Sequence, residues 1–201
     1  MIRDIVFDIG KVFVHLNPRP ILTFLSEHRA PCADLDALVT RIALEEHECG
    51  RVPGTGLLER LCGLTGLRAS AAQMRAQWLD MFELQPAMVA LARRLSERYG
   101  VYLLSNVGDL HWEHLCSAYG LDRIGHGALP SFQVGVTKPH ERIYAEAERK
   151  FALQPAATVF IDDRTANVEA ARARGWHGVV HRSYAQTCTA LRRLGVEAEP
   201  V

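Results

Sequence analysis

The stretch TVFIDDRTANVEAARARG, residues 158–175, contains the clearest local pattern in the chain. Its first four residues form a short apolar run that predicts a buried strand. An acidic pair, Asp162 and Asp163, follows at the point where this strand ends. Residues 165–174 have the apolar spacing of a helix, which Gly175 would terminate. A strand, a polar turn and a helix in this order are typical of the βαβ units that build parallel sheets.

The same alternation of strand and helix recurs elsewhere in the chain. Short apolar runs that end at polar or turn residues predict further strands at residues 4–7, 101–104 and 178–180. Helical spacing appears between these runs, at residues 86–98 and 140–151. We therefore expect an α/β fold whose core is a Rossmann-like, doubly wound parallel sheet with both faces covered.

A long helical segment, residues 18–82, interrupts this alternation. Helical patterns occupy four stretches of it, residues 21–28, 35–48, 57–64 and 70–82. The sequence PGTG at residues 53–56 predicts a loop between two of them. No strand pattern is evident in this segment. The predicted organisation is a core domain of residues 1–17 and 83–201, with a helical domain of residues 18–82 inserted after the first strand.

The composition is that of an ordinary globular protein, and it excludes several classes. Of the 201 residues 48% are apolar, and the 23 basic residues equal the 23 acidic ones, so no net field attracts nucleic acid or an anionic membrane. No run approaches the ~18 apolar residues of a membrane span, and the N-terminus lacks a signal-peptide pattern. The five cysteines form no CxxC pair. We expect a cytoplasmic monomer or homodimer without nucleic-acid or membrane partners.

Polar residues follow three of the predicted strands. Asp8, Ser105 and the pair Asp162-Asp163 each come directly after a short apolar run. In an open α/β sheet, ligands bind at the carboxyl ends of the strands, so these side chains should converge on one crevice. Each feature alone is weak, because an Asp after a strand is usually a turn residue and a Ser is often a helix cap. Their occurrence together predicts a site.

In this order the motifs resemble those of the haloacid dehalogenase (HAD) superfamily. The corresponding stretches are VFDIGKVFVHLNP from residue 6, LLSNVGD from residue 103, GVTKPHERIY from residue 135 and VFIDDRTANVEAA from residue 159. The helical insertion lies where that family has its type-one cap. Within the family, the first two of these motif sequences are similar to those of the bacterial α-glucose-1-phosphate phosphatase-like group. The resemblance implies a phosphatase that forms an aspartyl-phosphate intermediate on a small phosphorylated metabolite, with sugar phosphates as the first expectation.

The resemblance also implies a nucleophile and a metal site. Asp8 is at the nucleophile position, and a carboxylate that attacks phosphorus splits one difficult hydrolysis into two steps. The implied cofactor is Mg²⁺, which prefers oxygen ligands. Its protein ligands would be Asp8, the backbone carbonyl of Gly10, and Asp163.

The remaining motif residues are implied to hold the phosphoryl group and to orient the acidic residues. Ser105, Asn106 and Lys138 would bind the phosphoryl oxygens, and Ser105 and Lys138 would be catalytic together with the nucleophile. Lys138 would also pair with Asp162. Asn167 would support the metal site from one helical turn beyond Asp163. Outside the motifs, Lys138 would be interpreted as an exposed turn lysine and Asn167 as a surface amide.

The chain departs from the common family pattern at Gly10, where most HAD phosphatases carry a second Asp as general acid and base. General acid–base catalysis is typically worth ~10²–10⁴-fold. The protein is then either an active phosphatase, as in the glucose-1-phosphate phosphatase-like group, or a catalytically weakened HAD protein retained for binding. Lys11 either contacts phosphate or is a solvated loop residue. His15 is a possible but less favoured substitute acid or base.

Another reaction within this family is an alternative to phosphate hydrolysis. A haloacid dehalogenase would use the same Asp without a metal, and the pair Asp162-Asp163 favours phosphate chemistry instead. In the insertion, the polar residues named as candidates for leaving-group contacts are Arg41, Glu45, Glu46, His47 and Arg51. No other metal-ligating residues form a pattern with His111 and His114, and we expect both at the surface.

Overall fold

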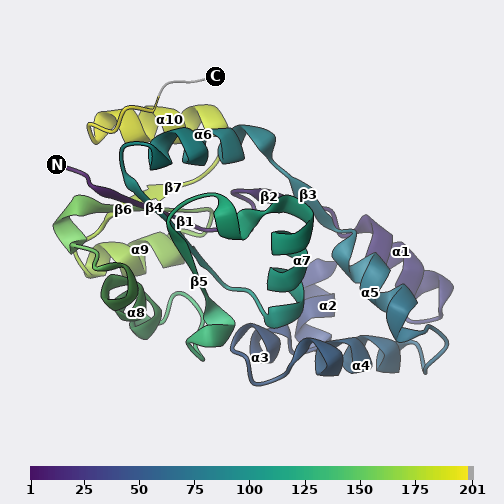
Figure 1. Cartoon of the computed structure of the whole chain (residues 1–201). Coiled ribbons are helices and arrows are strands. Elements are labelled where there is room, and N and C mark those ends of the chain that lie inside the picture. Colours follow the sequence, from purple (N-terminus) through teal and green to yellow (C-terminus); the bar gives the residue numbers. More distant parts are fainter. Residues whose placement is uncertain (199–201) are drawn as a thin grey trace.

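A parallel five-stranded sheet forms the centre of the protein, which is described here by a computed structural model for residues 1–198 (Figure 1). Its strand order is β5-β4-β1-β6-β7, so β1 lies in the middle. The strands are β1 Asp4–Phe7, β4 Gly100–Ser105, β5 Gly127–Pro130, β6 Thr158–Asp162 and β7 His177–Val180. All four neighbouring pairs are parallel. The predicted fold class is confirmed.

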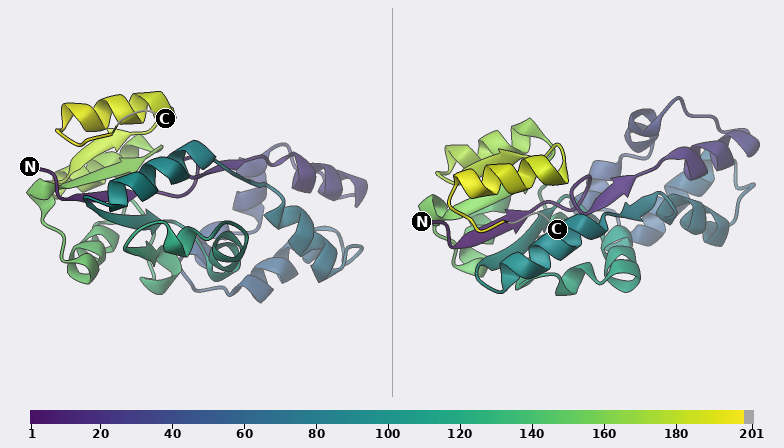
Figure 2. Two further views of the ribbon diagram at one scale, coloured as in Figure 1. Left: turned by 45° about the horizontal axis from the view of Figure 1, so that its top comes forward. Right: turned by 90° about the horizontal axis from the view of Figure 1, so that it is seen from above.

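Helices cover both faces of this sheet, as Figures 1 and 2 show. On one face, Ile5 and Phe7 of β1 pack in a core with apolar residues of α6 Pro86–Ser96 and α10 Tyr184–Arg193. On the other face, Val6 packs with residues of α8 Glu141–Phe151 and α9 Thr165–Ala173. Successive residues of β1 therefore point to opposite cores, which is the reason that the strand is apolar after Asp4. Three short 3₁₀ turns complete this part: Leu121–Arg123, Ser131–Gln133 and Pro155–Ala157.

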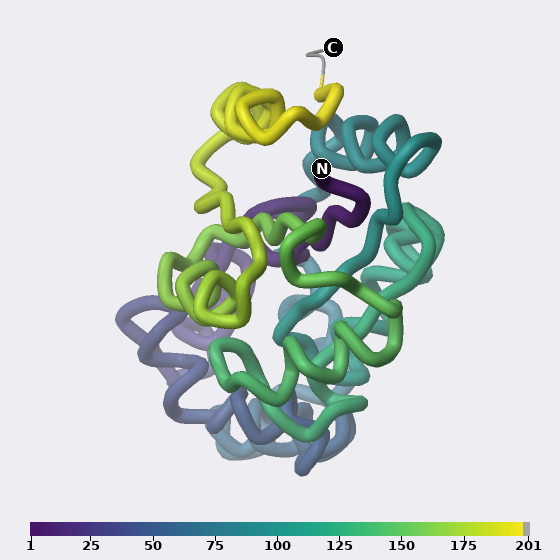
Figure 3. The backbone as a smooth tube through the Cα atoms, turned by 90° about the vertical axis from the view of Figure 1, so that its left-hand side faces the viewer, coloured from purple at the N-terminus to yellow at the C-terminus, as the bar shows by residue number. Residues whose placement is uncertain are grey.

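Five helices between β1 and β4 form a separate group, which we call the cap. They are α1 Arg19–Glu27, α2 Leu35–Arg41, α3 Leu44–Glu48, α4 Gly54–Leu64 and α5 Ala71–Leu79. They pack around a hydrophobic cluster of their own that includes Leu38, Leu61 and Trp78. Figures 1 and 3 show the cap on one side of the sheet, where it contacts the core through α7 Asp109–Tyr119. The predicted residue boundaries between the two domains stay a prediction.

The chain enters and leaves the cap through a two-stranded antiparallel ribbon. Its strands are β2 Val14–Leu16 and β3 Phe82–Leu84, with His15 opposite Glu83. Backbone hydrogen bonds from Asn17 to Met81 and from Gln85 to Phe13 extend the ribbon at both ends. Within residues 1–198 the ribbon holds both points at which the chain crosses between cap and core.

Several elements differ from the sequence predictions. The loop predicted at residues 53–56 is wrong, because α4 begins at Gly54 and Pro53 is its N-cap residue. Residues 35–48 form two helices, since Ala43 adopts a left-handed conformation with φ 47° between α2 and α3. Strands β2, β3 and β5 and helices α7 and α10 were not predicted. Among residues 1–198, no helix is both long and apolar enough to cross a membrane.

Candidate active site

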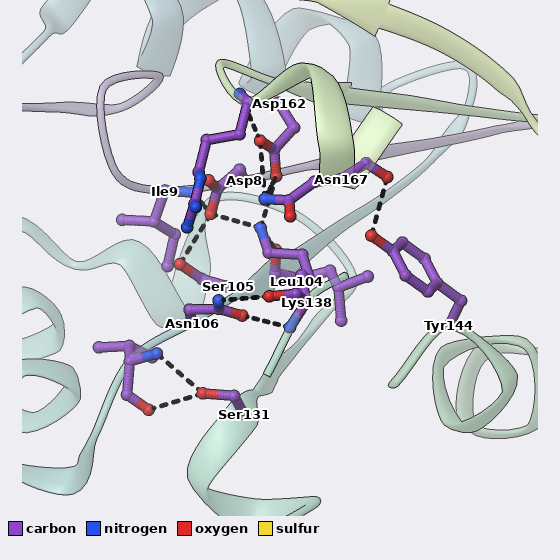
Figure 4. A network of polar contacts seen from close by, with 12 residues as sticks. Asp8, Ile9, Leu104, Ser105, Asn106, Ser131, Lys138, Tyr144, Asp162 and Asn167 are labelled. Atoms are coloured by element: carbon purple, nitrogen blue, oxygen red, sulfur yellow. Dashed lines mark hydrogen bonds and ion pairs between the residues drawn. The ribbon is translucent and has the colours of Figure 1, made fainter. Parts of the chain in front are cut away.

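The polar residues predicted to converge do meet at the carboxyl ends of three neighbouring strands (Figure 4). Asp8 follows β1, whereas Ser105 and Asp162 are the last residues of β4 and β6. The Ser105 hydroxyl donates to Asp8 Oδ1 at 2.8 Å, and the Asp8 amide donates to the Ile161 carbonyl at 2.8 Å. Parallel pairing of β1 with both neighbours brings these ends together. All three residues are buried.

Lys138 lies between the two buried aspartates, at 2% exposure. Its ammonium group is 2.8 Å from Asp8 Oδ1 and 2.7 Å from Asp162 Oδ2, and it also donates to the Leu104 carbonyl at 2.8 Å. These contacts use all three donors that an ammonium group has. Burial lowers the pKa of Lys138, but the two carboxylates outweigh it, so the pKa lies above its usual value. The lysine is therefore a fixed positive charge inside the site.

Asp8 has one occupied and one available carboxylate oxygen. Oδ1 accepts hydrogen bonds from the Ile9 amide at 2.6 Å and from Ser105, in addition to its ion pair with Lys138. Oδ2 accepts none from residues 1–198. Burial raises the pKa of Asp8 to about 6 against the opposing effect of Lys138. At neutral pH the group is therefore an anion with one oriented oxygen still able to bond.

The acidic pair after β6 divides into one fully engaged and one partly exposed side chain. Asp162 accepts from the Asn167 amide at 3.0 Å on each oxygen and from the Arg164 backbone amide at 2.8 Å. Asp163 is half-buried, and its Oδ2 is 3.7 Å from the Lys11 ammonium group. Asp162 is thus held in place by the protein, whereas Asp163 keeps oxygens for a ligand.

The oxygen atoms at this edge fit a magnesium ion. One carboxylate oxygen each of Asp8, Asp162 and Asp163 lies within 4.8 Å of the other two. The carbonyl oxygen of Gly10 accepts no hydrogen bond from the described residues. Asn167 Oδ1 is buried without a partner. Hard oxygen donors that the protein leaves unpaired are the ligands that Mg²⁺ prefers.

Asn106 is placed differently from the expectation that it binds phosphate. Its amide group donates to the Lys138 carbonyl at 3.0 Å, and its oxygen accepts from the Lys138 amide at 2.7 Å. These two hydrogen bonds join the loop after β4 to the backbone of Lys138. The side chain therefore positions the lysine, and a phosphate contact of Asn106 stays a prediction.

The two basic side chains near the nucleophile loop lie farther out. The Lys11 side chain is 62% exposed, its ammonium group is 3.7 Å from Asp163, and the residue also lines the cavity beside Ser105. His15 is exposed on β2, and it borders a different cavity that Lys11 and Asp163 also line. The structure therefore does not bring His15 to the hydrogen-bonding network around Asp8.

Gly10 leaves space where the common family pattern has an acidic side chain. A Cβ atom built at this position would have no heavy atom within 4 Å, and its φ angle is outside the left-handed region. A larger residue is therefore compatible with the loop. The backbone does not require glycine here.

Glu48, at the end of α3, is a candidate residue that the sequence analysis passed over. It is half-buried and lines a cavity together with Gly10, Ser105 and Asn106. Its carboxyl group makes no hydrogen bond or ion pair with residues 1–198. Burial, followed by the charges of Asp8 and Glu45, raises its pKa to about 7. A carboxyl group with this pKa can both give and take a proton at neutral pH.

The Glu48 backbone is fixed to the core by Ser131. The Ser131 hydroxyl donates to the Glu48 carbonyl at 2.6 Å and accepts from the Val107 amide at 2.9 Å. Val107 belongs to the loop that begins with Ser105. The helical spacing of Glu45 and Glu48 indicated a shared face, but only the packing of α3 on this loop shows which face meets the core.

The other polar residues named in the cap are exposed or contact protein groups outside the Asp8 network. Arg41 and Arg51 are exposed, and Glu46 is paired with Arg60. His47 is fully buried, with Nδ1 2.9 Å from the Val52 carbonyl. Glu45 also approaches the core, with its carboxylate 3.5 Å from the Thr137 hydroxyl.

The surface position expected for His111 is wrong. The side chain is 5% exposed, and its Nε2 accepts a hydrogen bond from the Trp78 indole. Burial and the neighbouring His47 and His114 lower its pKa to about 3, so His111 is neutral in the folded protein. It is part of the contact between α7 and the cap.

Comparison with known proteins agrees with this geometry. The pattern of the haloacid dehalogenase-like hydrolases matches residues 5–175. A sesquiterpene phosphatase from Aspergillus oryzae is 26% identical over 192 residues, 94% of each chain. A D-ribitol-5-phosphate phosphatase from Bacteroides thetaiotaomicron is 26% identical over 188 residues, which are 88% of this chain and 90% of the relative. A solved HAD-family enzyme from the same bacterium, in complex with magnesium and inorganic phosphate, has a TM-score of 0.76 and 22% identity over 90% of this chain and 95% of that one.

Proposed function

Since the chain belongs to the haloacid dehalogenase-like hydrolase family, we propose that it is a magnesium-dependent phosphatase of a small phosphorylated metabolite, with Asp8 as the nucleophile. The observation that carries this proposal is the state of Asp8. Three donors hold one of its oxygens, and the other oxygen is available at the carboxyl edge of the sheet. Such a fixed, ionised carboxylate is suited to attack a phosphorus atom in line with the leaving group.

Two phosphatases among its relatives support a phosphate monoester as substrate, but their substrates differ. One acts on a sesquiterpene compound and the other on a polyol phosphate, according to their names. The shared part is the phosphoryl group. The sugar phosphate expected from the sequence therefore stays a prediction, as do the cytoplasmic location and the monomeric or dimeric state.

In the first step, Asp8 Oδ2 forms a bond to phosphorus, and the bond between phosphorus and the leaving-group oxygen breaks. The Ser105 hydroxyl and the Lys138 ammonium group, which contact Asp8 Oδ1 in the free protein, would turn to the phosphoryl oxygens when substrate binds. Lys138 keeps its position because Asp162 and Asn106 fix its two ends. In the second step, water attacks the aspartyl-phosphate, which releases phosphate and restores Asp8.

Asp8, Asp163 and the Gly10 carbonyl would hold Mg²⁺, with Asn167 beside them. When bound, the ion offsets the repulsion between the anionic nucleophile and the anionic substrate. The Asp162-Asp163 pair thus has distinct roles within the proposal. Asp162 orients Lys138, and Asp163 is a ligand.

The first step requires a proton donor for the leaving-group oxygen and the second requires a proton acceptor for the attacking water, and Gly10 can supply neither. We assign both roles to Glu48, which lines the same cavity as Gly10 and Ser105 from the cap side. Its carboxyl proton would pass to the leaving-group oxygen, and the resulting carboxylate would take a proton from the attacking water. Because the pKa of Glu48 is about 7, both protonation states are populated at neutral pH.

The experiment compares the wild type with Asp8→Asn on an aryl phosphate and a panel of alkyl and polyol phosphates, with Mg²⁺ and with chelator. We expect turnover that needs both the ion and Asp8. Asn keeps the size of the side chain but is a poor nucleophile. A folded wild-type protein without turnover on any substrate would refute the proposal and favour the alternative of a HAD-fold binding protein, with Gly10 as its cause. Magnesium-independent release of halide from a haloacid would favour the dehalogenase alternative.

A further inference from the structure

A cavity of about 210 Å³ lies between the cap and the core, directly beside the candidate active site. Its polar end is formed by Lys11, Glu48, Ser105 and Asn106, together with the loop at Gly10. This end adjoins the Asp8 carboxylate, which is hydrogen-bonded to Ser105. A phosphate monoester held by Ser105 would therefore direct its leaving group into the cavity.

The walls away from this end are apolar. Leu35 and Val39 come from α2, Leu44 comes from α3, and Trp78 and Met81 come from the end of the cap. Leu16 of β2 and Leu115 of α7 complete them from the other side. Leu16, Leu35, Val39 and Leu44 are only partly buried, although they pack against the hydrophobic cluster of the cap. Their remaining exposed surface includes the cavity wall.

The polar groups on these walls already have partners or lie at the rim. The Trp78 indole N–H donates to His111 Nε2, so this pair presents ring surface to the cavity. Asp36 is the only charged residue from α2 at the cavity, and it is exposed. Consequently, few donors or acceptors are available to the hydroxyl groups of a polyol.

We propose that this cavity binds an apolar leaving group, so that the preferred substrate is an alkyl or similarly hydrophobic phosphate monoester and not a sugar phosphate. The inference rests on the proposed phosphatase function and adds the class of alcohol that is released. A buried hydroxyl without a hydrogen-bond partner is unfavourable, whereas each methylene group that leaves water is favourable.

This preference predicts a dependence on chain length. Each methylene added to the leaving group should raise kcat/KM about fourfold, until the cavity is full. A polyol phosphate with the same number of carbon atoms should gain nothing from its length. The assay measures kcat/KM for an n-alkyl phosphate series from methyl to octyl, and for polyol phosphates of three to six carbons, with p-nitrophenyl phosphate as the general phosphatase substrate.

A matched pair of variants tests whether the cavity is the cause. Leu35→Asn places an amide on the cavity wall and should reduce the gain per methylene, chiefly through KM. Leu22→Asn is the control, because Leu22 is equally half-buried and packs against the same cap cluster without lining this cavity. It should keep the wild-type dependence on chain length.

The possible outcomes separate this inference from the proposed function. Turnover of p-nitrophenyl phosphate with a flat alkyl series, or with polyol phosphates preferred, overturns the apolar cavity and leaves the phosphatase intact. Equal effects of Leu35→Asn and Leu22→Asn on the series also overturn it. Absence of turnover on every substrate overturns the phosphatase and this inference with it. A rising alkyl series in the wild type supports the inference even where Leu35→Asn fails to fold.

Discussion

Replacement of Glu48 by Gln tests the proposal that Glu48 is the proton donor. Gln has nearly the same size, so the packing of α3 on the Ser105 loop and the hydrogen bond from Ser131 to the residue 48 carbonyl should persist. Only the titratable proton is lost. Glu59→Gln is the control, because Glu59 is an exposed glutamate on another cap helix, α4, and does not line the cavity.

The magnitude follows from what the carboxyl group would supply. General acid–base catalysis is typically worth about 10²–10⁴-fold, and this loss is expected in kcat for an alkyl phosphate, whose alcohol must be protonated as it leaves. An aryl phosphate with a stable phenolate as leaving group needs little protonation, so its kcat should fall far less. Glu59→Gln should change neither value.

The pH dependence provides a second measurement. With a pKa of about 7, the protonated form of Glu48 becomes scarcer by about tenfold for each pH unit well above 7. The wild-type kcat for the alkyl phosphate should therefore decline on the alkaline side, and Glu48→Gln should remove this decline. A Glu48→Gln protein with an unchanged profile, or with equal losses on alkyl and aryl substrates, would show that Glu48 has a structural role only.

A second substitution tests whether a carboxyl group at position 10 can replace that of Glu48. A side chain at position 10 would meet no heavy atom at its Cβ, so Gly10→Asp can place a carboxyl group on the nucleophile loop. In the Glu48→Gln background, Gly10→Asp should recover part of the lost kcat on the alkyl phosphate. No recovery in a folded double variant would argue that position 10 does not face the leaving group.

Two further predictions concern stability. Lys138→Met leaves Asp8 and Asp162 buried without their counter-charge, and should lower the free energy of unfolding at pH 7 by about 3–5 kcal/mol in urea titrations. Lys150→Met, at an exposed lysine, is the control. Equal losses in the two variants would contradict the buried network. His111 has a pKa of about 3 in the folded protein, so below its unfolded pKa of about 6.5 only the unfolded chain binds the proton. Its contribution is present above pH 6.5 and is lost as the pH falls toward 3. The stability difference between the wild type and His111→Gln should therefore shrink by about 2 kcal/mol from pH 7 to pH 5, and a difference independent of pH would refute a neutral, buried His111.

The sheet could be predicted from the sequence because its central strands are buried on both faces. Residues 5–7, 101–104 and 159–161 are therefore almost entirely apolar, and a polar residue follows each run. Strand β5 escaped prediction because its four residues, GALP, include a glycine and a proline. Helix α7 escaped because its buried face includes His111, whose polarity is balanced by the Trp78 indole from a distant part of the chain.

From the sequence, only the site residues at the ends of the sheet strands could be predicted to lie together. The ends of parallel neighbours must meet, so Asp8, Ser105 and Asp162 could be expected together without knowledge of the cap. Lys138 lies on a loop, and only the motif resemblance indicated its place. Glu48 could not be chosen from among the acidic residues at positions 45, 46 and 48, because the choice depends on how α3 packs against the loop after β4.

The proposed role of Glu48 would make the chemistry depend on contact between cap and core. An acid on the nucleophile loop would remain beside Asp8 whether or not the cap covered the site. An acid on α3 reaches the leaving group only while α3 lies against the Ser105 loop, where Ser131 joins the two backbones. The same helix supplies Leu44 to the apolar wall of the cavity. Filling the cavity with an apolar leaving group would thus stabilise the arrangement that brings the proton donor into place, so alcohols that leave the cavity empty should lose kcat as well as affinity.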